Sequence, residues 1–187
     1  MCGVTPKYTL RERSHRVTQV LQERVHIGRL DGPGHPGVSL QFPGVRFQTD
    51  LWLPARRHDV FAFFADAANL ESITPPWLRF EVATPMPVSM ARGALIDYRL
   101  RIHGIPLRWR AEITVWEPPH RFVDEQRHGP YRRWVHTHTF IEERGGTRIS
   151  DEVDFEAPGP RFVNRLVMRD VRRIFEYRGR ALRKLFA

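Results

Sequence analysis

Two histidines separated by one residue, His136 and His138, are the side chains of this sequence with the clearest capacity for chemistry. They lie in the alternating stretch 133–142, where residues two apart point to the same side of an extended strand. Trp134 and Phe140 share that side, so the two imidazoles stand in a row with two aromatic rings. Such a face suits a packed core or the lining of a ligand chamber better than contact with bulk water.

The histidine pair has three interpretations. Two imidazoles on one strand face could chelate a metal, but no third ligand is evident, since Asp151 and Glu125 are only possible neighbours. We therefore expect no metal and no cofactor. One imidazole could instead act as a general acid or base toward a bound carbonyl compound. The interpretation that we favour is polar lining, with each imidazole bonded to a residue of a neighbouring strand.

Asp151 interrupts the otherwise apolar face of the stretch 147–156, so its carboxylate should find a partner, and a histidine of the adjacent strand is the expected one. Such a pair could orient an imidazole for catalysis or simply hold two strands in register, and the second role is the commoner. Tyr98 brings a hydroxyl to an apolar strand face, where it either enters the chamber or reaches solvent at the rim. If the chain is an enzyme, the catalytic candidates are His136, His138, Asp151 and Tyr98.

These side chains need a scaffold, which the hydrophobic periodicity predicts. Alternation predicts seven strands, at 45–53, 78–84, 94–103, 107–116, 121–128, 133–142 and 147–156. After the first strand, apolar spacing predicts two short helices, 59–65 and 67–72, the second capped by Asp66. Residues 161–185 are amphipathic, and as a helix they would span about 37 Å, enough to lie across a whole sheet.

Charge and composition exclude several classes of function. The net charge of +9 is concentrated at the ends of the chain, because residues 161–187 hold nine basic side chains against two acidic ones and residues 45–160 are nearly neutral. A neutral body argues against a dedicated nucleic-acid surface. The single cysteine excludes an internal disulfide, and no glycine-rich phosphate loop, nucleophile elbow, HExxH or CxxC motif is present.

The chain length of 187 residues fits one domain preceded by a tail. Glycines and prolines break the pattern of residues 1–44, which we interpret as a flexible N-terminal extension to a domain at 45–187. The first residues lack the apolar core of a secretory signal, and no apolar run is long enough to span a membrane. The expected location is therefore cytoplasmic.

Several motifs together carry a resemblance to a known family. They are Leu53-Pro54-Ala55, the stretches 60–66, 73–78 and 113–119, Phe122-Val123-Asp124, Gly129-Pro130-Tyr131 and Asp151-Glu152-Val153. In these, the chain resembles the START-like, or Bet v 1-like (SRPBCC), helix-grip superfamily, most of all its polyketide cyclase/dehydrase and coenzyme-Q-binding branch. The resemblance implies an α+β helix-grip fold, in which a curved, seven-stranded antiparallel sheet wraps around the long C-terminal helix and two short helices follow the first strand.

The same resemblance implies a hydrophobic cavity between sheet and helix that binds a lipid, a quinone or a polyketide-like molecule. The expected lining residues are Phe61, Trp77, Tyr98, Leu100, Trp109, Trp134, His136, His138, Phe140, Phe155, Val167 and Val171. Two alternatives stay open, since a fold alone does not fix a function. One is a polyketide aromatase/cyclase or dehydratase. The other is a membrane- or ribosome-associated accessory protein whose basic C-terminal helix makes a peripheral contact with anionic lipid.

Overall fold

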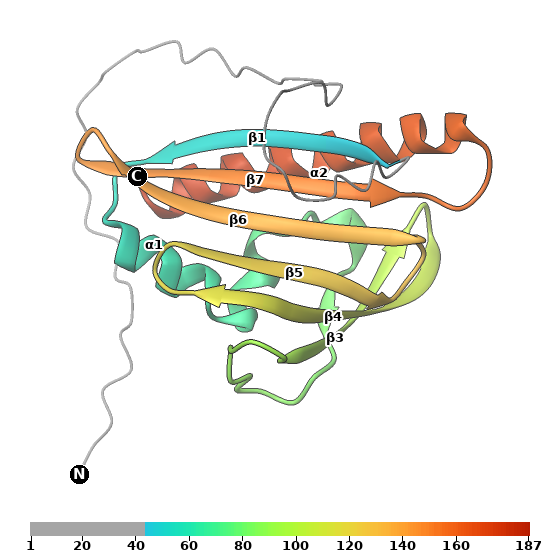
Figure 1. Ribbon diagram of the computed structural model, residues 1–187, viewed down its shortest axis with the longest axis horizontal. Coiled ribbons are helices and arrows are strands. Elements are labelled where there is room, and N and C mark those ends of the chain that lie inside the picture. The colour runs from blue at the N-terminus through green and yellow to red at the C-terminus, as the bar shows by residue number, and fades with distance from the viewer. Residues whose placement is uncertain (1–43) are drawn as a thin grey trace, which may run out of the picture.

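The computed structural model describes residues 44–187, so the extension predicted at 1–44 lies outside the described residues except for Gly44. The strands are β1 (Val45–Leu53), β2 (Glu81–Val82), β3 (Leu95–Ile102), β4 (Ile105–Glu117), β5 (Arg121–His128), β6 (Arg133–Glu143) and β7 (Gly146–Glu156). The helices are α1 (Arg57–Phe64), the 3₁₀ helices η1 (Ala67–Ile73) and η2 (Pro76–Leu78), and α2 (Arg161–Leu185). The predicted α+β helix-grip fold is confirmed (Figure 1).

The seven strands form one antiparallel sheet in the order β1-β7-β6-β5-β4-β3-β2. Strands β2 to β7 follow one another as a meander, and β1 closes the far side against β7. Two hairpin loops, His103–Gly104 and Arg144–Gly145, have positive φ at both residues, as two-residue type I′ turns require. Figure 1 shows α2 running behind β1 and β7, along the length of these strands.

The structure differs from the predicted elements in the segment before β3. The predicted strand 78–84 contains only two paired residues, because η2 occupies its start and Arg79 takes a left-handed conformation with φ of 43°. The predicted second short helix is present as the 3₁₀ helix η1. Its expected cap is confirmed, since the Asp66 carboxylate accepts a hydrogen bond of 3.0 Å from the backbone N–H of Ala68.

A β-bulge in β4 changes the side to which Trp116 points. Strict alternation places Trp116 opposite Trp109, but the pairing of β4 with β5 shifts register between Ile113 and Val115. An extra residue in one strand reverses the alternation beyond it. Trp116 therefore turns inward, and its ring centroid lies 5.2 Å from that of Phe61.

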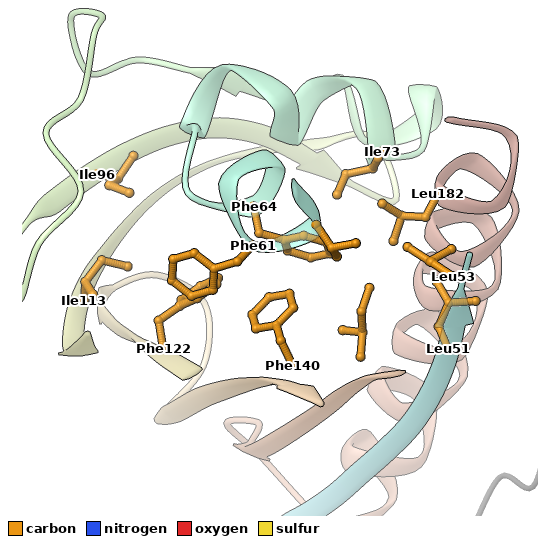
Figure 2. Close-up of a cluster of buried hydrophobic side chains, with 12 residues drawn as sticks. Leu51, Leu53, Phe61, Phe64, Ile73, Ile96, Ile113, Phe122, Phe140 and Leu182 are labelled. Carbon is orange, nitrogen blue, oxygen red and sulfur yellow. The ribbon is translucent and has the colours of Figure 1, made fainter. Parts of the chain in front are cut away.

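The first hydrophobic cluster joins the short helices to the sheet at one end of the molecule. Figure 2 shows Phe61 and Phe64 of α1 reaching toward Phe122 and Phe140 of the sheet. The Phe140 ring lies 5.2 Å from each of the two α1 rings, in edge-to-face geometry. Leu182 of α2 completes this cluster, so α1, α2 and the sheet are held together by one set of contacts.

A second hydrophobic cluster holds the N-terminal half of α2 against β1 and β7. It consists of Phe47, Val153, Phe155, Val171 and Phe175. The rings of Phe47 and Phe175 lie 4.9 Å apart. Because the two clusters hold α2 at separate places, the space between them need not be filled by side chains. That space contains the candidate site.

Within residues 44–187, no helix combines the length and the apolar character needed to cross a bilayer.

Candidate functional site

A cavity of about 480 Å³ lies between the sheet and α2, in contact with η1 and η2. Its walls are mainly aromatic and aliphatic, and the large aromatic rings among them are Phe64, Trp77, Phe80, Tyr98, Trp109, Phe122, Tyr131 and Trp134. This volume is within the range of small-molecule sites, which are commonly apolar with a few placed polar groups. The cavity has polar groups too: one set gathers on the sheet, and others, among them His103, Asp170 and Arg178, line it elsewhere.

Three aromatic rings from β4, β6 and the loop between β5 and β6 form one wall. The Trp134 ring stacks on Tyr131 at 5.0 Å and meets Trp109 at 5.3 Å and 90°. The Gln126 side-chain amide donates a hydrogen bond of 2.6 Å to the Tyr131 carbonyl and accepts one from the Tyr131 N–H. This amide fixes the loop that begins with Gly129-Pro130, so that Tyr131 is held against the wall. Burial raises the pKa of Tyr131 to about 12.

The polar groups on the sheet come from three adjacent strands, and strand register brings them together. Asp124 of β5 pairs directly with His136 of β6, and His138 pairs directly with Asp151 of β7. Directly paired residues of an antiparallel sheet project to the same side. The two imidazoles therefore lie side by side, with ring centroids 3.7 Å apart, and one carboxylate lies on either side of them. We call Asp124, His136, His138 and Asp151 the polar cluster.

Each imidazole of the polar cluster approaches both carboxylates. His136 Nε2 lies 3.1 Å from Asp151 Oδ1, and His136 Nδ1 lies 3.5 Å from Asp124 Oδ2. His138 Nε2 lies 3.3 Å from Asp124 Oδ2, and His138 Nδ1 lies 2.7 Å from Asp151 Oδ1. That last pair is close but not aligned as a hydrogen bond, so the buried His138 Nδ1 has no hydrogen-bond partner.

Burial and mutual attraction act in opposite directions on the charges of the polar cluster. Burial by itself would raise the pKa of the Asp151 carboxyl, but His138 and His136 hold that pKa well below its usual range. The pKa of Asp124 is also lowered, because the hydrogen bond from His138 and the nearby cations outweigh burial. Both carboxylates are therefore ionised inside a largely apolar wall, and such charges require compensation.

Arg178 of α2 faces the polar cluster from the opposite wall. Its guanidinium lies 5.0 Å from the Phe175 ring centroid and lines the cavity. Its buried Nε–H has no hydrogen-bond partner. Burial lowers the pKa of this group, while Asp151 and Asp124 act in the opposite sense. Since arginine stays protonated in proteins, the cavity contains a fixed cation with a free donor.

Tyr98 adds a hydroxyl to the same chamber. Its ring packs at 5.0 Å against Phe80, on the wall formed by β3. Burial and the nearby Asp124 carboxylate raise the pKa of the phenol far above its usual value. The hydroxyl therefore keeps its proton and can donate a hydrogen bond into the cavity.

A family model for polyketide cyclase/dehydrase and lipid transport matches residues 53–178 of the chain. The match extends from the end of β1 to Arg178, so it includes every wall of the cavity. This chain belongs to that family. Its members bind hydrophobic ligands in general. A search of curated protein sequences found no significant match.

Solved structures with the same fold come from bacteria and plants. Protein Ms6760 from Mycobacterium smegmatis is 19% identical, with a TM-score of 0.58 over 75% of this chain and 89% of its own. Protein CV1439 from Chromobacterium violaceum is 13% identical, with a TM-score of 0.59 over 75% and 96%. The ginseng major latex-like protein 151 from Panax ginseng is 10% identical, with a TM-score of 0.57 over 76% and 97%. At these identities, the likeness establishes the fold alone.

The structure divides the residues predicted as lining into two groups. Those that line the cavity are Trp77, Tyr98, Leu100, Trp109, Trp134, His136, His138 and Val171. Phe61, Phe140, Phe155 and Val167 do not line it, and they pack within or against the two hydrophobic clusters. Asp151 lies behind the imidazoles and reaches the cavity only through them.

Several polar residues that line the cavity were missing from the predicted set, among them Asp124 and Arg178. Asp124 shares its strand face with Phe122, but only the register of β5 against β6 places it beside His136. Its Oδ2 lies 3.5 Å from His136 Nδ1 and 3.3 Å from His138 Nε2, a proximity that the sequence did not reveal. Arg178 did give a signal, because it is a charged residue within the apolar stripe of residues 161–185. A cation on a buried helix face needs a partner or a ligand.

The arginines on the opposite side of α2 are mostly exposed, as the amphipathic pattern predicts. Arg165, Arg169, Arg180 and Arg183 are exposed, and Arg172 is half-buried. Arg173 is exposed too, but it lines the cavity and its guanidinium lies 5.5 Å from the Trp77 ring centroid. Two large apolar side chains, Phe162 and Leu166, are also exposed on this helix, at 60% and 58%. The peripheral contact with anionic lipid remains a prediction for this surface.

Proposed function

We propose that this protein binds a hydrophobic small molecule in the cavity between the sheet and α2, with an acceptor oxygen of that molecule directed at Arg178. The single observation that carries the proposal is a cavity with aromatic walls that the cationic side chain of Arg178 lines from α2. A carboxylate, an enolate or a carbonyl oxygen would supply a partner for this cation.

The composition of the cavity walls favours a ligand with a largely apolar body. Trp109, Trp134 and Tyr131 present a continuous aromatic surface, and Leu100, Ile96 and Ile113 lie on the sheet beside it. Each square ångström of apolar ligand surface removed from water contributes about 25 cal/mol, so a drug-sized apolar body supplies most of the affinity. Flat or ring-containing molecules suit such a wall, because aromatic rings pack at defined angles.

The buried cation of Arg178 favours a ligand with a polar end. A buried donor without a partner costs about 1–3 kcal/mol, and more when the group is charged. Asp124 and Asp151 attract Arg178 electrostatically, yet neither accepts a hydrogen bond from its Nε–H. An acceptor on the ligand would offset the burial of the guanidinium charge, which makes Arg178 the expected determinant of ligand class.

We expect Arg178→Met to weaken binding of an anionic aromatic probe, naphthalene sulfonate, by about 10- to 100-fold, because a charged hydrogen bond contributes about 1.5–3 kcal/mol. Neutral naphthalene should bind both proteins with similar affinity. Quenching of the fluorescence of Trp77, Trp109 and Trp134, which line the cavity, provides the measurement.

Arg180→Met is the matched control, since Arg180 is exposed on the same helix. This variant should bind both probes like the wild type. Equal losses for the anionic and neutral probes in Arg178→Met would contradict an acceptor-directed site.

A second candidate function is cyclisation or dehydration of a polyketide-like substrate. The observation that favours it is the convergence of Tyr98, Asp124, His136 and His138 on one chamber, since acid–base chemistry needs several polar groups around the reacting carbonyl. A wild-type protein that converts a poly-β-ketone analogue should lose that activity in His136→Ala. A wild type that leaves such analogues unchanged would limit the imidazoles to a binding role.

A further inference from the structure

We propose that Asp124, His136 and His138 form a binding site for one divalent transition-metal ion at the sheet wall of the cavity, with Asp151 orienting both imidazoles. This site is independent of the hydrophobic ligand proposed above, because it is built from the three strands β5, β6 and β7 alone. It would add a Lewis acid to the chamber in which the ligand lies.

The spacing of the three candidate ligand atoms is already suitable for an ion. One atom from each of Asp124, His136 and His138 lies within 4.8 Å of the other two. Asp124 Oδ2 is 3.5 Å from His136 Nδ1 and 3.3 Å from His138 Nε2. Ligands about 2.0–2.2 Å from a tetrahedral ion lie roughly 3.3 Å from one another, so these atoms need little movement.

Asp151 stands where the supporting carboxylate of a histidine metal site belongs. A histidine that binds a metal through one nitrogen commonly donates its other N–H to a carboxylate, which fixes the tautomer. The two imidazole nitrogens that face away from Asp124 are His136 Nε2 and His138 Nδ1. They lie 3.1 Å and 2.7 Å from the same atom, Asp151 Oδ1. The pair with His136 Nε2 already has hydrogen-bond geometry, whereas the His138 ring would have to rotate slightly for its Nδ1–H to donate to the same oxygen.

A buried nitrogen without a hydrogen bond, His138 Nδ1, gives a second reason to propose a metal ion. In the arrangement without a metal, His138 directs Nε2 at Asp124, and its Nδ1 is buried without a hydrogen bond despite its proximity to Asp151. A metal at Nε2 would assign the proton of neutral His138 to Nδ1, opposite the Asp151 carboxylate. The same ion would add to the compensation of the Asp124 charge, which His138, His136 and Arg178 supply in part.

The ligand set indicates the class of ion. Two imidazole nitrogens and one carboxylate oxygen suit Zn²⁺, Co²⁺ or Fe²⁺, whereas Ca²⁺ and Mg²⁺ prefer sites built from oxygen atoms. Three protein ligands leave at least one coordination position for water or substrate. Asp124 retains 21% side-chain exposure while His136 and His138 retain 7% and 6%, so the open side of the site is the Asp124 side, toward the cavity.

The guanidinium of Arg178 and a second proton on His138 each act against a metal ion at this site. The guanidinium of Arg178 faces the cluster and repels a cation, so Arg178→Met should tighten metal binding. The same substitution should weaken binding of the anionic probe, so the two proposals make opposite predictions for one variant. A second proton on His138 is the alternative to a metal, because an imidazolium would also offset the two carboxylates.

Co²⁺ is the probe of choice, because its visible absorption reports the number and geometry of its ligands. The full chain, stripped with EDTA and dialysed, should bind one Co²⁺, and Zn²⁺ should displace it. Asp124→Asn and His136→Gln should each lower the affinity at least 100-fold. Asp151→Asn should lower it about 10- to 100-fold while the stoichiometry stays at one, as expected for an orienting group. His128→Gln, an exposed histidine on β5, is the matched control and should bind like the wild type.

The test stays decisive if a substitution in the cluster prevents folding. In that case the wild type alone should show a one-to-one Co²⁺ complex and a higher melting temperature with Zn²⁺ than with Mg²⁺. Wild-type protein that binds no Co²⁺ at micromolar concentrations would overturn the proposal in favour of the protonated cluster. Retention of wild-type affinity by a folded His136→Gln variant would overturn it as well, because the ion would then be bound elsewhere.

Discussion

Replacement of Asp151 by asparagine is expected to lower the free energy of unfolding of the metal-free protein by about 3–5 kcal/mol, the usual cost of breaking a buried ion pair from one side. The Asp151 side chain is 6% exposed, and its Oδ1 lies within 3.1 Å of one nitrogen on each imidazole. Asparagine keeps the shape and removes the charge. The imidazoles of His136 and His138 would then keep Asp124 as the one carboxylate of the polar cluster beside them.

Chemical denaturation in EDTA measures this effect, with Asp154→Asn as the matched control. Asp154 lies on the same strand, and its bidentate ion pair with Arg46 is partly exposed to solvent. Partly exposed pairs contribute roughly 0–1 kcal/mol, so the control should lose little. Similar losses in the two variants would mean that the polar cluster does not hold the three strands together.

Replacement of Leu100 by tryptophan is expected to lower affinity for a hydrophobic ligand at least tenfold. Leu100 is half-buried on β3 and lines the cavity, so a larger ring at this place occupies the volume that the ligand needs. A tenfold loss of affinity corresponds to about 1.4 kcal/mol. Burying a few methylene groups of the ligand contributes more than this, so excluding them from the cavity would suffice. Titration with an apolar fluorophore that brightens in a dry environment measures the change.

Leu95→Trp controls for the general effect of a tryptophan on β3. Leu95 is 49% exposed and does not line the cavity. Both variants should unfold at similar denaturant concentrations, because neither position belongs to the two hydrophobic clusters. Binding that survives in a folded Leu100→Trp protein would place the ligand outside the cavity.

The order of the elements could be predicted because each element carries a local signal. Alternation of apolar residues marks strands, and the 25-residue amphipathic pattern marks α2. The errors lie where local rules compete. η2 shortens β2 because Pro76 and the left-handed Arg79 turn the backbone. The bulge in β4 turns Trp116 inward, and a bulge depends on pairing with β5 rather than on the sequence of β4 alone.

The candidate site was harder to predict than the fold, because its residues meet only through strand register. The sequence indicated a pair between Asp151 and a histidine, and the structure shows Asp151 close to both. Asp124 could not be assigned, since a shift of β5 by one residue would direct it to the other face of the sheet. Which aromatic residues line the cavity and which fill the core also depends on packing depth, and Phe140 and Phe155 lie in the hydrophobic clusters rather than at the cavity wall.

Native mass spectrometry of protein purified without detergent tests the central claim, occupation of the cavity by a hydrophobic molecule, most directly. We expect wild-type protein to carry one small molecule per chain that is released on denaturation and extracts into organic solvent. The Leu100→Trp protein should carry none, and Arg178→Met should lose a ligand that bears a carboxylate or an enolate. A wild-type protein that carries no small molecule, and that does not bind added hydrophobic probes sized for a cavity of about 480 Å³, would contradict the account.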